Sequence, residues 1–292
     1  KTHKDKLLNV AAERIHYEFL RFLSFSQCFP LLQTMGETGL LETILPELTP
    51  THAIPPNGHH HLGLFEHTLE LVQQAERWLP ELDAASQERL NSLIAPFATR
   101  AGVVKLACLL HDVGKPDTMD VLENGRYTFY GHEKVSEEMT EVVCQRLKLS
   151  KDIRTLAKKL ARWHLYPCQF GQNSPRKSVL RFFRRIEDDT PDLILLALAD
   201  RHSTLGPEIT PDIIETATKD HLWLLEQYYE EQKTLKLPPL LTGEEVMATL
   251  KLTPGPKVGE AMRALAEAHQ LGEVSDKKSA KAWLVCAYPQ GL

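Results

Sequence analysis

An apolar run that ends in a histidine and an aspartate is the first feature of this sequence that could carry chemistry. The stretch LACLLHDVGKPDTMD places His111 and Asp112 directly after residues that have the composition of a buried helix. Burying a carboxylate is costly unless it is paired or bound to a metal ion. The doublet is therefore either the end of an ordinary core helix or the floor of a metal site.

Four further segments with the period of a helix each place one imidazole or carboxylate on or beside an apolar face. A single residue of this kind is most simply a hydrogen-bonded core residue. Five helices with the same feature favour a shared cation, because every buried polar group needs a partner. Imidazole and carboxylate ligands without thiolates favour Mn, Fe, Co, Ni, Zn or Mg. The four additional residues are His67, His132, His164 and Asp200.

The elements that must position these residues are helices almost throughout. The 3.6-residue period recurs along the chain, and strand-like alternation is almost absent. One exception is TMDVLENGRYTFY, where Asn124-Gly125 is typical of the turn of a small β-hairpin. The sequence thus predicts an all-α helical bundle with flanking helical segments and one hairpin. The predicted helices are 5–24, 29–46, 64–79, 87–111, 132–148, 151–164, 176–187, 191–204, 211–233, 243–251 and 257–271.

The predicted helix over 132–148 also has a predicted buried face. Its apolar side chains place that face along Val135, Met139, Val142 and Val143, with His132 in the same stripe.

The composition sets limits on the setting in which this chain works. Hydrophobic residues make up 42% and charged residues 25%, as in soluble globular proteins. No apolar stretch approaches the roughly 18 residues that span a bilayer, so we expect no membrane association and a cytoplasmic location. The five cysteines are scattered, which predicts free thiols. A net charge of −5 argues against nucleic-acid affinity of the whole molecule but allows a local basic patch.

The order of the candidate ligands resembles that of the HD superfamily of metal-dependent phosphohydrolases. The positions that carry the resemblance are His67, the His111-Asp112 doublet and Asp200. In that family these residues hold a divalent ion, and the aspartate of the doublet can bridge to a second ion. The resemblance implies a cofactor of one or two divalent ions, phosphate-ester hydrolysis, and a catalytic role for Asp112.

His132, in YGHE, and His164 resemble the ligands of the second ion in dinuclear members of the family. Such members often carry a further histidine near the second of these positions. Here Trp163 and Leu165 flank it instead. The triplet His59–His61 could compensate, but we expect it to form a solvent-exposed loop.

Lys115, in HDVGK, is the candidate for contacting the phosphoryl group, since an ammonium stabilises charge on phosphate oxygens. The alternative is that it only compensates the carboxyl end of its helix. Arg126 and Tyr130, on the hairpin beside the YGHE histidine, could line the pocket, but they are not assigned to the site.

Resemblance to a second family extends over most of the chain. Its segments look like the neck, body and tail of bacterial tRNA nucleotidyltransferases and poly(A) polymerases. The catalytic head of that family carries a glycine-rich nucleotide loop and paired aspartates on a strand, and we find neither motif in these 292 residues. We therefore expect no nucleotidyl transfer from this chain alone. The segments are NVAAERIHYEFLRFL, LLQTMGETGLLETILPEL, FYGHEKVSEEMTEVVCQRLKLS and LLTGEEVMATLKLTPGPKVGEAMRALAEAHQLGEV.

Proline-bearing polar segments and these resemblances divide the chain into four predicted parts. They are an N-terminal neck-like segment (1–50), an HD domain (51–205), a connecting helix and linker (206–240) and a helical tail (241–292). After the last boundary, Thr242 and Glu245 are typical of a capping box that opens a helix.

A basic segment lies within this acidic chain. Residues 151–185 contain ten Lys or Arg and one acidic residue. One face of the predicted helix 176–187 could follow a phosphate backbone, or it could be a solvated face balanced by the acidic residues 187–189. The basic residues of that face are Lys177, Arg181, Arg184 and Arg185.

Two functions follow from these patterns. The first is a metal-dependent phosphohydrolase, of the phosphomonoesterase or 2′,3′-cyclic phosphodiesterase type, acting on nucleotides or RNA ends in tRNA 3′-end processing. The second is a non-catalytic RNA-binding body of a tRNA nucleotidyltransferase that lacks its catalytic head. Both have a nucleotide or a tRNA-like RNA as partner. A third and weaker alternative is a nucleotide-sensing HD domain without turnover.

Overall fold

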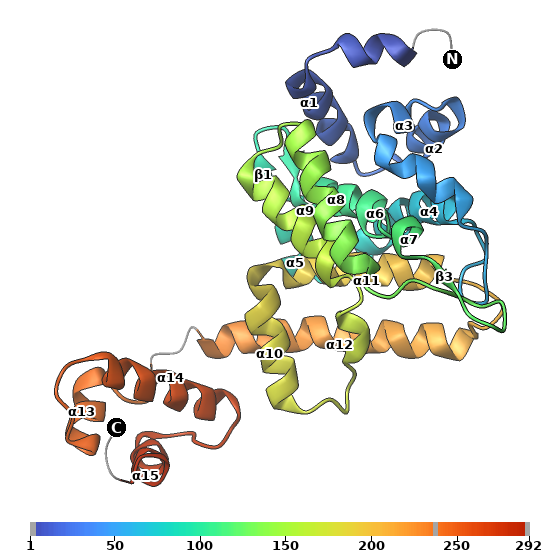
Figure 1. Cartoon of the computed structure of the whole chain (residues 1–292). Helices are drawn as coiled ribbons and strands as arrows, with labels where there is room; N and C mark the ends of the chain where they lie inside the picture. Colours follow the sequence, from blue (N-terminus) through green and yellow to red (C-terminus); the bar gives the residue numbers. More distant parts are fainter. Residues whose placement is uncertain (1–3, 236–238, 290–292) are drawn as a thin grey trace. The chain divides into compact units, whose positions relative to one another are not determined.

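The computed structural model describes residues 4–235 and 239–289, and most of these residues are helical (Figure 1). This confirms the all-α prediction. The chain divides into two compact units. The first consists of Lys1–Asn173 and Phe183–Leu225, and the second of Ser174–Phe182 and Glu226–Leu292. Among the described helices, none is both long enough and apolar enough to cross a membrane.

The first unit is built around four helices whose apolar faces meet. α4 (Leu64–Trp78) packs against α6 (Arg100–Leu110) and α11 (Thr190–Ser203), and α6 packs in turn against α9 (Lys151–Trp163). Almost every residue of α6 is buried, as the apolar run before the His-Asp doublet predicts. The α6 helix therefore lies at the centre of the unit, and its carboxyl end lies in the interior.

The N-terminal helices are shorter than predicted. The helix expected over 5–24 is a 3₁₀ segment, Lys4–Asn9, followed by α1 (Ala12–Leu23), with extended backbone at Ala11 between them. The helix expected over 29–46 divides into α2 (Phe29–Thr38) and α3 (Leu41–Ile44), followed by a 3₁₀ segment, Pro46–Ala53. Gly39 ends α2 because it adopts a left-handed conformation with φ +68°.

The prediction of a single helix over 87–111 is wrong. The structure has α5 (Ala84–Asn91), a second small hairpin of β1 (Leu93–Ala95) and β2 (Ala98–Thr99), and then α6. Pro96 lies in the turn of this hairpin, and a proline inside a helical pattern ends or kinks the helix. The helical period of the apolar residues continues across the break, so the period alone does not show that the helix ends.

The helix α8 (His132–Arg146) packs against α9, and its buried face matches the predicted one only in part: His132 and Val143 are buried, but Val135 and Met139 are half-buried. Val142 is 58% exposed, whereas Ser136 and Thr140 are completely buried. Small polar side chains allow α8 to approach its neighbours closely. The Ser136 hydroxyl accepts a hydrogen bond from the Gly114 N–H. The buried face is formed by His132, Ser136, Thr140, Val143 and Cys144.

The predicted hairpin over residues 118–130 is confirmed. The short α7 (Lys115–Thr118) leads into β3 (Asp120–Val121), which pairs antiparallel with β4 (Tyr127–Thr128). Gly125 has φ +77° in the turn, and Arg126 N–H donates to the side chain of Asn124.

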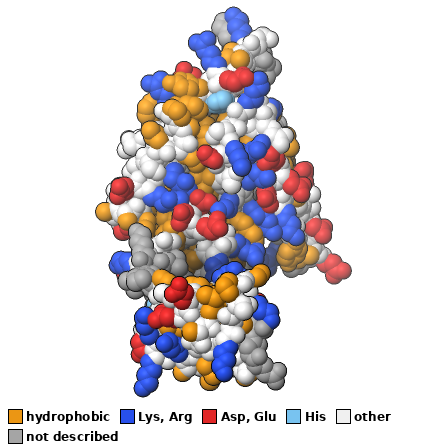
Figure 2. All heavy atoms as spheres, turned by 90° about the vertical axis from the view of Figure 1, so that its left-hand side faces the viewer, with side chains coloured by type: hydrophobic (Ala, Val, Ile, Leu, Met, Phe, Trp, Pro, Cys, Tyr) orange, Lys and Arg blue, Asp and Glu red, His pale blue; other side chains and the backbone are white. Residues whose placement is uncertain are grey.

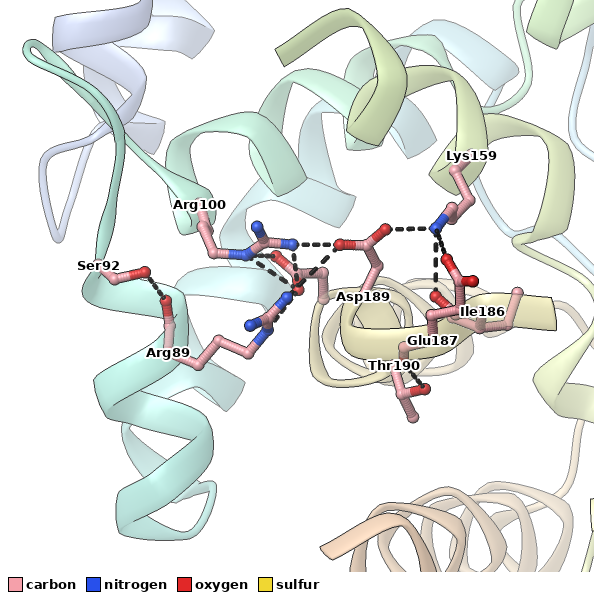
Figure 3. Close-up of polar contacts among 9 residues, drawn as sticks. Arg89, Ser92, Arg100, Lys159, Ile186, Glu187, Asp189 and Thr190 are labelled. Carbon is pink, nitrogen blue, oxygen red and sulfur yellow. Dashed lines mark hydrogen bonds and ion pairs between the residues drawn. The ribbon is translucent and has the colours of Figure 1, made fainter. Parts of the chain in front are cut away.

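A buried charge network fixes the start of α11 (Figure 3). Asp192, which is fully buried, accepts hydrogen bonds from Arg100 Nε at 3.0 Å and Nη2 at 2.9 Å. Asp189 accepts from Arg100 and from Lys159, and Arg89 completes the network. The network thereby ties α5, α6 and α9 to the amino end of the helix whose last turn carries the candidate ligand aspartate.

The second unit contains α13 (Gly243–Leu250), α14 (Pro256–Gln270) and α15 (Lys277–Ala287). The predicted capping box of Thr242 and Glu245 is present at the start of α13. The helix α15 was not predicted, although Asp276 and Ser279 form an equivalent capping box. Two helices, α10 (Arg176–Ile186) and α12 (Pro211–Leu235), have residues in both units. The core of this unit includes Leu241, Val246, Ala261, Leu265, Ala280 and Leu284.

Candidate metal centre

The structure brings the six candidate ligands together as two triads. The three ligand atoms of each triad lie within 4.8 Å of one another, and every residue is buried except Asp200, which is partly exposed. His111 and Asp112, adjacent in the chain, contribute one residue to each triad. The first triad is His67, His111 and Asp200, and the second is Asp112, His132 and His164.

The ligand residues come mostly from the ends of helices. His67 lies in the first turn of α4, and His132 is the first residue of α8. His111 and His164 are the residues that follow α6 and α9, and Asp200 lies in the last turn of α11. Five helices therefore bring the six residues together, with the His111-Asp112 doublet following α6 and one residue from each of the other four.

Hydrogen bonds to the backbone fix the tautomer of three of the histidines. In each one, Nδ1 lies within hydrogen-bond distance of the carbonyl oxygen three residues earlier. A carbonyl only accepts, so Nδ1 carries the hydrogen and donates it. The remaining nitrogen, Nε2, is then a free acceptor, as in histidines that bind metals. The bonds are His111 to Cys108 (2.9 Å), His132 to Phe129 (2.7 Å) and His164 to Ala161 (2.8 Å).

In the second triad these acceptors face one another. The Nε2 atoms of His132 and His164 are 3.3 Å apart, and Asp112 Oδ1 lies 3.1 Å from the first and 3.5 Å from the second. Two lone pairs and a carboxylate oxygen would repel one another in a buried place unless a cation lies among them. Ligand atoms at about 2.1 Å from one ion are themselves roughly 3.0–3.4 Å apart, which matches this spacing.

The first triad also contains polar atoms that lack protein partners. Both ring nitrogens of His67 are buried without a hydrogen bond, and Nε2 lies 3.4 Å from Asp200 Oδ1. His111 Nε2 is 3.1 Å from Asp112 Oδ2, again without hydrogen-bond geometry. Unpartnered buried polar atoms are rare in proteins. Together, the imidazole nitrogens and carboxylate oxygens of both triads form a ligand set that suits one or two divalent ions.

The charge states of two residues of the second triad, Asp112 and His164, suit cation binding. Burial alone would raise the pKa of Asp112, but the neighbouring His111 and Lys115 outweigh it and hold this pKa well below its usual range. Burial lowers the pKa of His164 to about 3, so its imidazole is neutral. An ionised carboxylate and a neutral imidazole are the forms that bind metals.

Lys115 lies at the edge of this centre. Its ammonium forms an ion pair with Asp112 Oδ2 at 2.5 Å and lies 5.6 Å from the centre of the Phe129 ring. It lines a cavity of about 230 Å³ that also contains the second triad and Asp200. This lysine therefore compensates a buried carboxylate and also faces the cavity, so its position is compatible with both interpretations of its role.

Gly114 allows the His-Asp turn to pack on α8. A Cβ atom at this position would lie 2.6 Å from the carbonyl oxygen of His132, 2.7 Å from the Ser136 nitrogen and 2.8 Å from the Val135 Cβ. Only glycine fits this approach without displacement. The glycine of HDVGK thus helps to place His132 beside Asp112.

The expectation that the histidine triplet is simply exposed is wrong for His60. His59 and His61 are exposed, but His60 is half-buried and its ring lies 4.5 Å from that of His67. Its Nδ1 is buried without a partner, and burial lowers its pKa to about 3. The Asn57 side chain holds this loop by accepting the N–H groups of His59 and His60. An Asn-Gly pair before the triplet was the available signal for an ordered turn.

Backbone pairing fixes the same loop from the other side. Gly206 N–H donates to the His59 carbonyl at 2.6 Å, and Glu208 N–H donates to the Gly58 carbonyl at 2.9 Å. A Cβ atom at Gly206 would lie 2.3 Å from the His59 carbonyl carbon. The loop is therefore held close to the segment that follows α11, which places His60 beside the centre.

The four candidate RNA-binding residues of α10 are exposed, whereas its apolar residues are buried. Lys177 and Arg181 belong to the second unit, and Arg184 and Arg185 to the first. The guanidinium of Arg185 lies 4.7 Å from the centre of the Trp163 ring. Figure 2 shows Lys and Arg side chains interspersed with Asp and Glu on the face that it draws.

Comparison with known families identifies the region that carries the triads. A family model described as HD domain matches residues 64–205. The chain carries an HD domain. All six candidate ligands fall inside the HD domain, whereas His60 lies just before the matched range. A second model, described as a probable RNA and SrmB-binding site of polymerase A, matches residues 1–51.

The relatives in sequence are tRNA nucleotidyltransferases. An A-adding tRNA nucleotidyltransferase of Deinococcus radiodurans is 35% identical over 94% of this chain and 58% of its own length. A CC-adding tRNA nucleotidyltransferase of Thermus thermophilus is 36% identical over 94% of this chain and 56% of its own length. The chain thus spans little more than half of these curated relatives. It is consistent with the C-terminal part of such enzymes.

Proposed function

We propose that this chain is a metal-dependent phosphohydrolase that acts on phosphomonoesters or 2′,3′-cyclic phosphates of nucleotides or RNA ends. The proposal also connects it with tRNA 3′-end processing, which the names of the relatives support. The HD domain supports the hydrolytic chemistry, since the family resemblance implies it.

The observation that carries this proposal is the convergence of acceptors in the second triad. Nε2 of His132, Nε2 of His164 and Asp112 Oδ1 meet in the interior, and with the ring hydrogens on Nδ1 none of the three has a hydrogen to donate to the others. A purely structural cluster would pair its acceptors with donors, because unpaired buried acceptors cost free energy. The arrangement is therefore better suited to binding cations than to stabilising the fold.

The residues of the centre have separable roles in this proposal. A bound divalent ion supplies positive charge for phosphate oxygens and lowers the pKa of a water molecule. The first triad and the second triad would each hold one such ion. Lys115 lines the cavity beside both, so its ammonium can contact a phosphate oxygen and orient the ester.

The test is hydrolysis of 2′,3′-cyclic AMP by protein that has been stripped of metal and then reloaded with Mn²⁺, Ni²⁺, Co²⁺, Mg²⁺ or Zn²⁺. We expect turnover with at least one ion and its loss in Asp112→Ala. The matched control is Asp212→Ala, which removes an exposed aspartate far along the chain. No turnover with any ion, from wild-type protein that remains folded, would contradict the proposal.

A second candidate function, RNA binding without hydrolysis, is supported by other observations. The match at residues 1–51 is to an RNA-binding model, and α10 presents exposed basic residues. Binding to tRNA would then weaken steeply with salt. Replacing Lys177 and Arg181 by Gln should lower the slope of log K against log salt by about one per lost phosphate contact. The control is Lys219→Gln, and an equal effect of that exposed lysine would contradict this candidate.

A further inference from the structure

A larger cavity adjoins the candidate metal centre. Its volume is about 550 Å³, compared with about 230 Å³ for the cavity that contains the second triad. The two cavities share His59, His60 and Lys115 in their walls. The smaller cavity is below the usual size range of ligand sites, and the larger one is within it. A substrate larger than the smaller cavity can extend past Lys115 into the larger one.

Three segments that are far apart in the sequence form this cavity: the 56–60 loop, the β3–β4 hairpin with Phe129, and Glu208. The hairpin and the loop both lie at the same end of the first unit (Figure 1). Tyr127 and Phe129 contribute aromatic rings to the wall. The arrangement is thus a partly aromatic chamber that shares His59, His60 and Lys115 with the smaller cavity at the metal centre.

The polar groups of the chamber have both signs of charge. Arg126 and Glu208 line it together with the amides of Asn57 and Asn124. Arg126 Nη2 lies 3.3 Å from His59 Nε2, and Glu208 Oε2 lies 3.7 Å from the same atom. A chamber for a second phosphate would contain mainly positive charge. Hydrogen-bond donors and acceptors beside aromatic rings are instead suited to a neutral heterocycle that has donors and acceptors on its own edge.

We propose that this chamber binds the nucleoside part of the substrate while its phosphate lies beside Lys115. Tyr127 stacks on the base, and Arg126 and Glu208 contact its polar edge. The inference rests on the proposed function and assigns the residues that would recognise the nucleoside of its nucleotide substrate. It also gives the β3–β4 hairpin a role in specificity.

The walls of the chamber are largely pre-formed. The Asn57 amide and the backbone bonds to Gly206 and Glu208 hold the loop, and strand pairing of Val121 with Tyr127 holds the hairpin. Rigid walls reduce the entropy that is lost on binding. A single side chain that points into such a chamber can therefore be replaced without collapse of the site.

The test compares two ligands that differ only in the nucleoside. Calorimetry on the metal-loaded full chain would measure binding of adenosine 2′-phosphorothioate, chosen as a slowly hydrolysed analogue, and of inorganic thiophosphate. We expect Tyr127→Ala to weaken the nucleotide about tenfold, the effect of losing one stacked base, and to change thiophosphate binding less than twofold. The matched control is Tyr130→Ala, because Tyr130 is on the same hairpin segment but 86% exposed.

Three outcomes would overturn the inference. In the first, wild-type protein binds the nucleotide no more tightly than thiophosphate, or does not bind it at all. In the second, Tyr127→Ala weakens the binding of both ligands equally. In the third, Tyr130→Ala has the same effect as Tyr127→Ala. A parallel assay of 2′,3′-cyclic AMP hydrolysis separates this inference from the proposed function. Selective nucleotide binding without hydrolysis would support the chamber and contradict the hydrolase.

Discussion

Replacing Gly114 by alanine is a direct test of how the fold builds the metal centre. The added Cβ would lie 2.6–2.8 Å from two backbone atoms of α8 and from the Val135 Cβ. Carbon atoms pack at about 3.5 Å or more, so the amino end of α8 must move by roughly 0.7 Å. His132 is the first residue of that helix and would move with it. Metal–ligand distances tolerate changes of only about 0.2 Å, so the displaced imidazole would be a poor ligand.

Two measurable effects follow from that displacement. The ion at the second triad should bind about 10- to 100-fold more weakly, which is the usual effect of misplacing a ligand's support. Overpacking should also lower the free energy of unfolding of the metal-free protein by about 1–3 kcal/mol. Calorimetric titration with Mn²⁺ or Ni²⁺ measures the first effect, and urea unfolding of the stripped protein measures the second.

The control for this experiment is Gly259→Ala in α14. There the added Cβ would have only an ordinary contact, 3.5 Å from an Arg263 side-chain nitrogen. It should leave ion binding unchanged and should not lower stability, because alanine is the better helix former. If Gly114→Ala bound ions as tightly as wild type and unfolded at the same urea concentration, the account of this turn given above would be refuted.

Two further variants test the supports of the centre. Asp192→Ala leaves Arg100 partly uncompensated in a buried network, so it should lower the free energy of unfolding by about 3–5 kcal/mol. The control Lys219→Ala removes one partner of an exposed ion pair within a single helix and should leave the urea midpoint unchanged. Equal effects of these two variants would contradict the network. His60→Ala should weaken binding of the nucleotide analogue or of the ions, because this ring lines both cavities, whereas His61→Ala should have no effect. If His60→Ala bound the analogue and the ions as tightly as wild type, this histidine would only fill space.

Much of the fold could be predicted from the sequence because the period of a helix is local. Helices such as α4, α9 and α11 have uninterrupted apolar stripes, and the structure has them within a residue or two of the predicted ends. The error at 87–111 arose where two helices and a hairpin happen to continue one period. The proline at position 96 was a local signal against a continuous helix, and the apolar pattern outweighed it.

The buried face of α8 shows where periodicity alone misleads. Apolar residues were taken to define the face, but Ser136 and Thr140 are buried instead, and Val142 is exposed. Ser136 lies where α8 meets the His-Asp turn, and its backbone nitrogen would be 2.7 Å from a Cβ at Gly114, so a small side chain fits this close approach. His132 lies four residues before Ser136, on the same face of the helix, and is buried with it.

The candidate centre could be predicted in part for a related reason. The six residues on helices or directly after them follow from phase and from family resemblance, since both depend on sequence order. His60 could not be placed in the same way, because its position depends on backbone bonds between the 57–60 loop and residues 206–208. No local pattern predicts a contact between segments almost 150 residues apart. The second cavity, which needs the same contact together with the hairpin, was missed as a consequence.

The ends of two helices explain why histidines occur where the ligands are needed. The last carbonyl groups of a helix have no partner within it. At the ends of α6 and α9 the next residue is a histidine, and its Nδ1–H donates to one of those carbonyls, on Cys108 and Ala161. One bond thus satisfies the helix end, fixes the tautomer and directs Nε2 towards the centre. The rings of His111 and His164, with centroids 5.0 Å apart, are therefore held by the backbone in the orientation that turns both Nε2 atoms towards the centre.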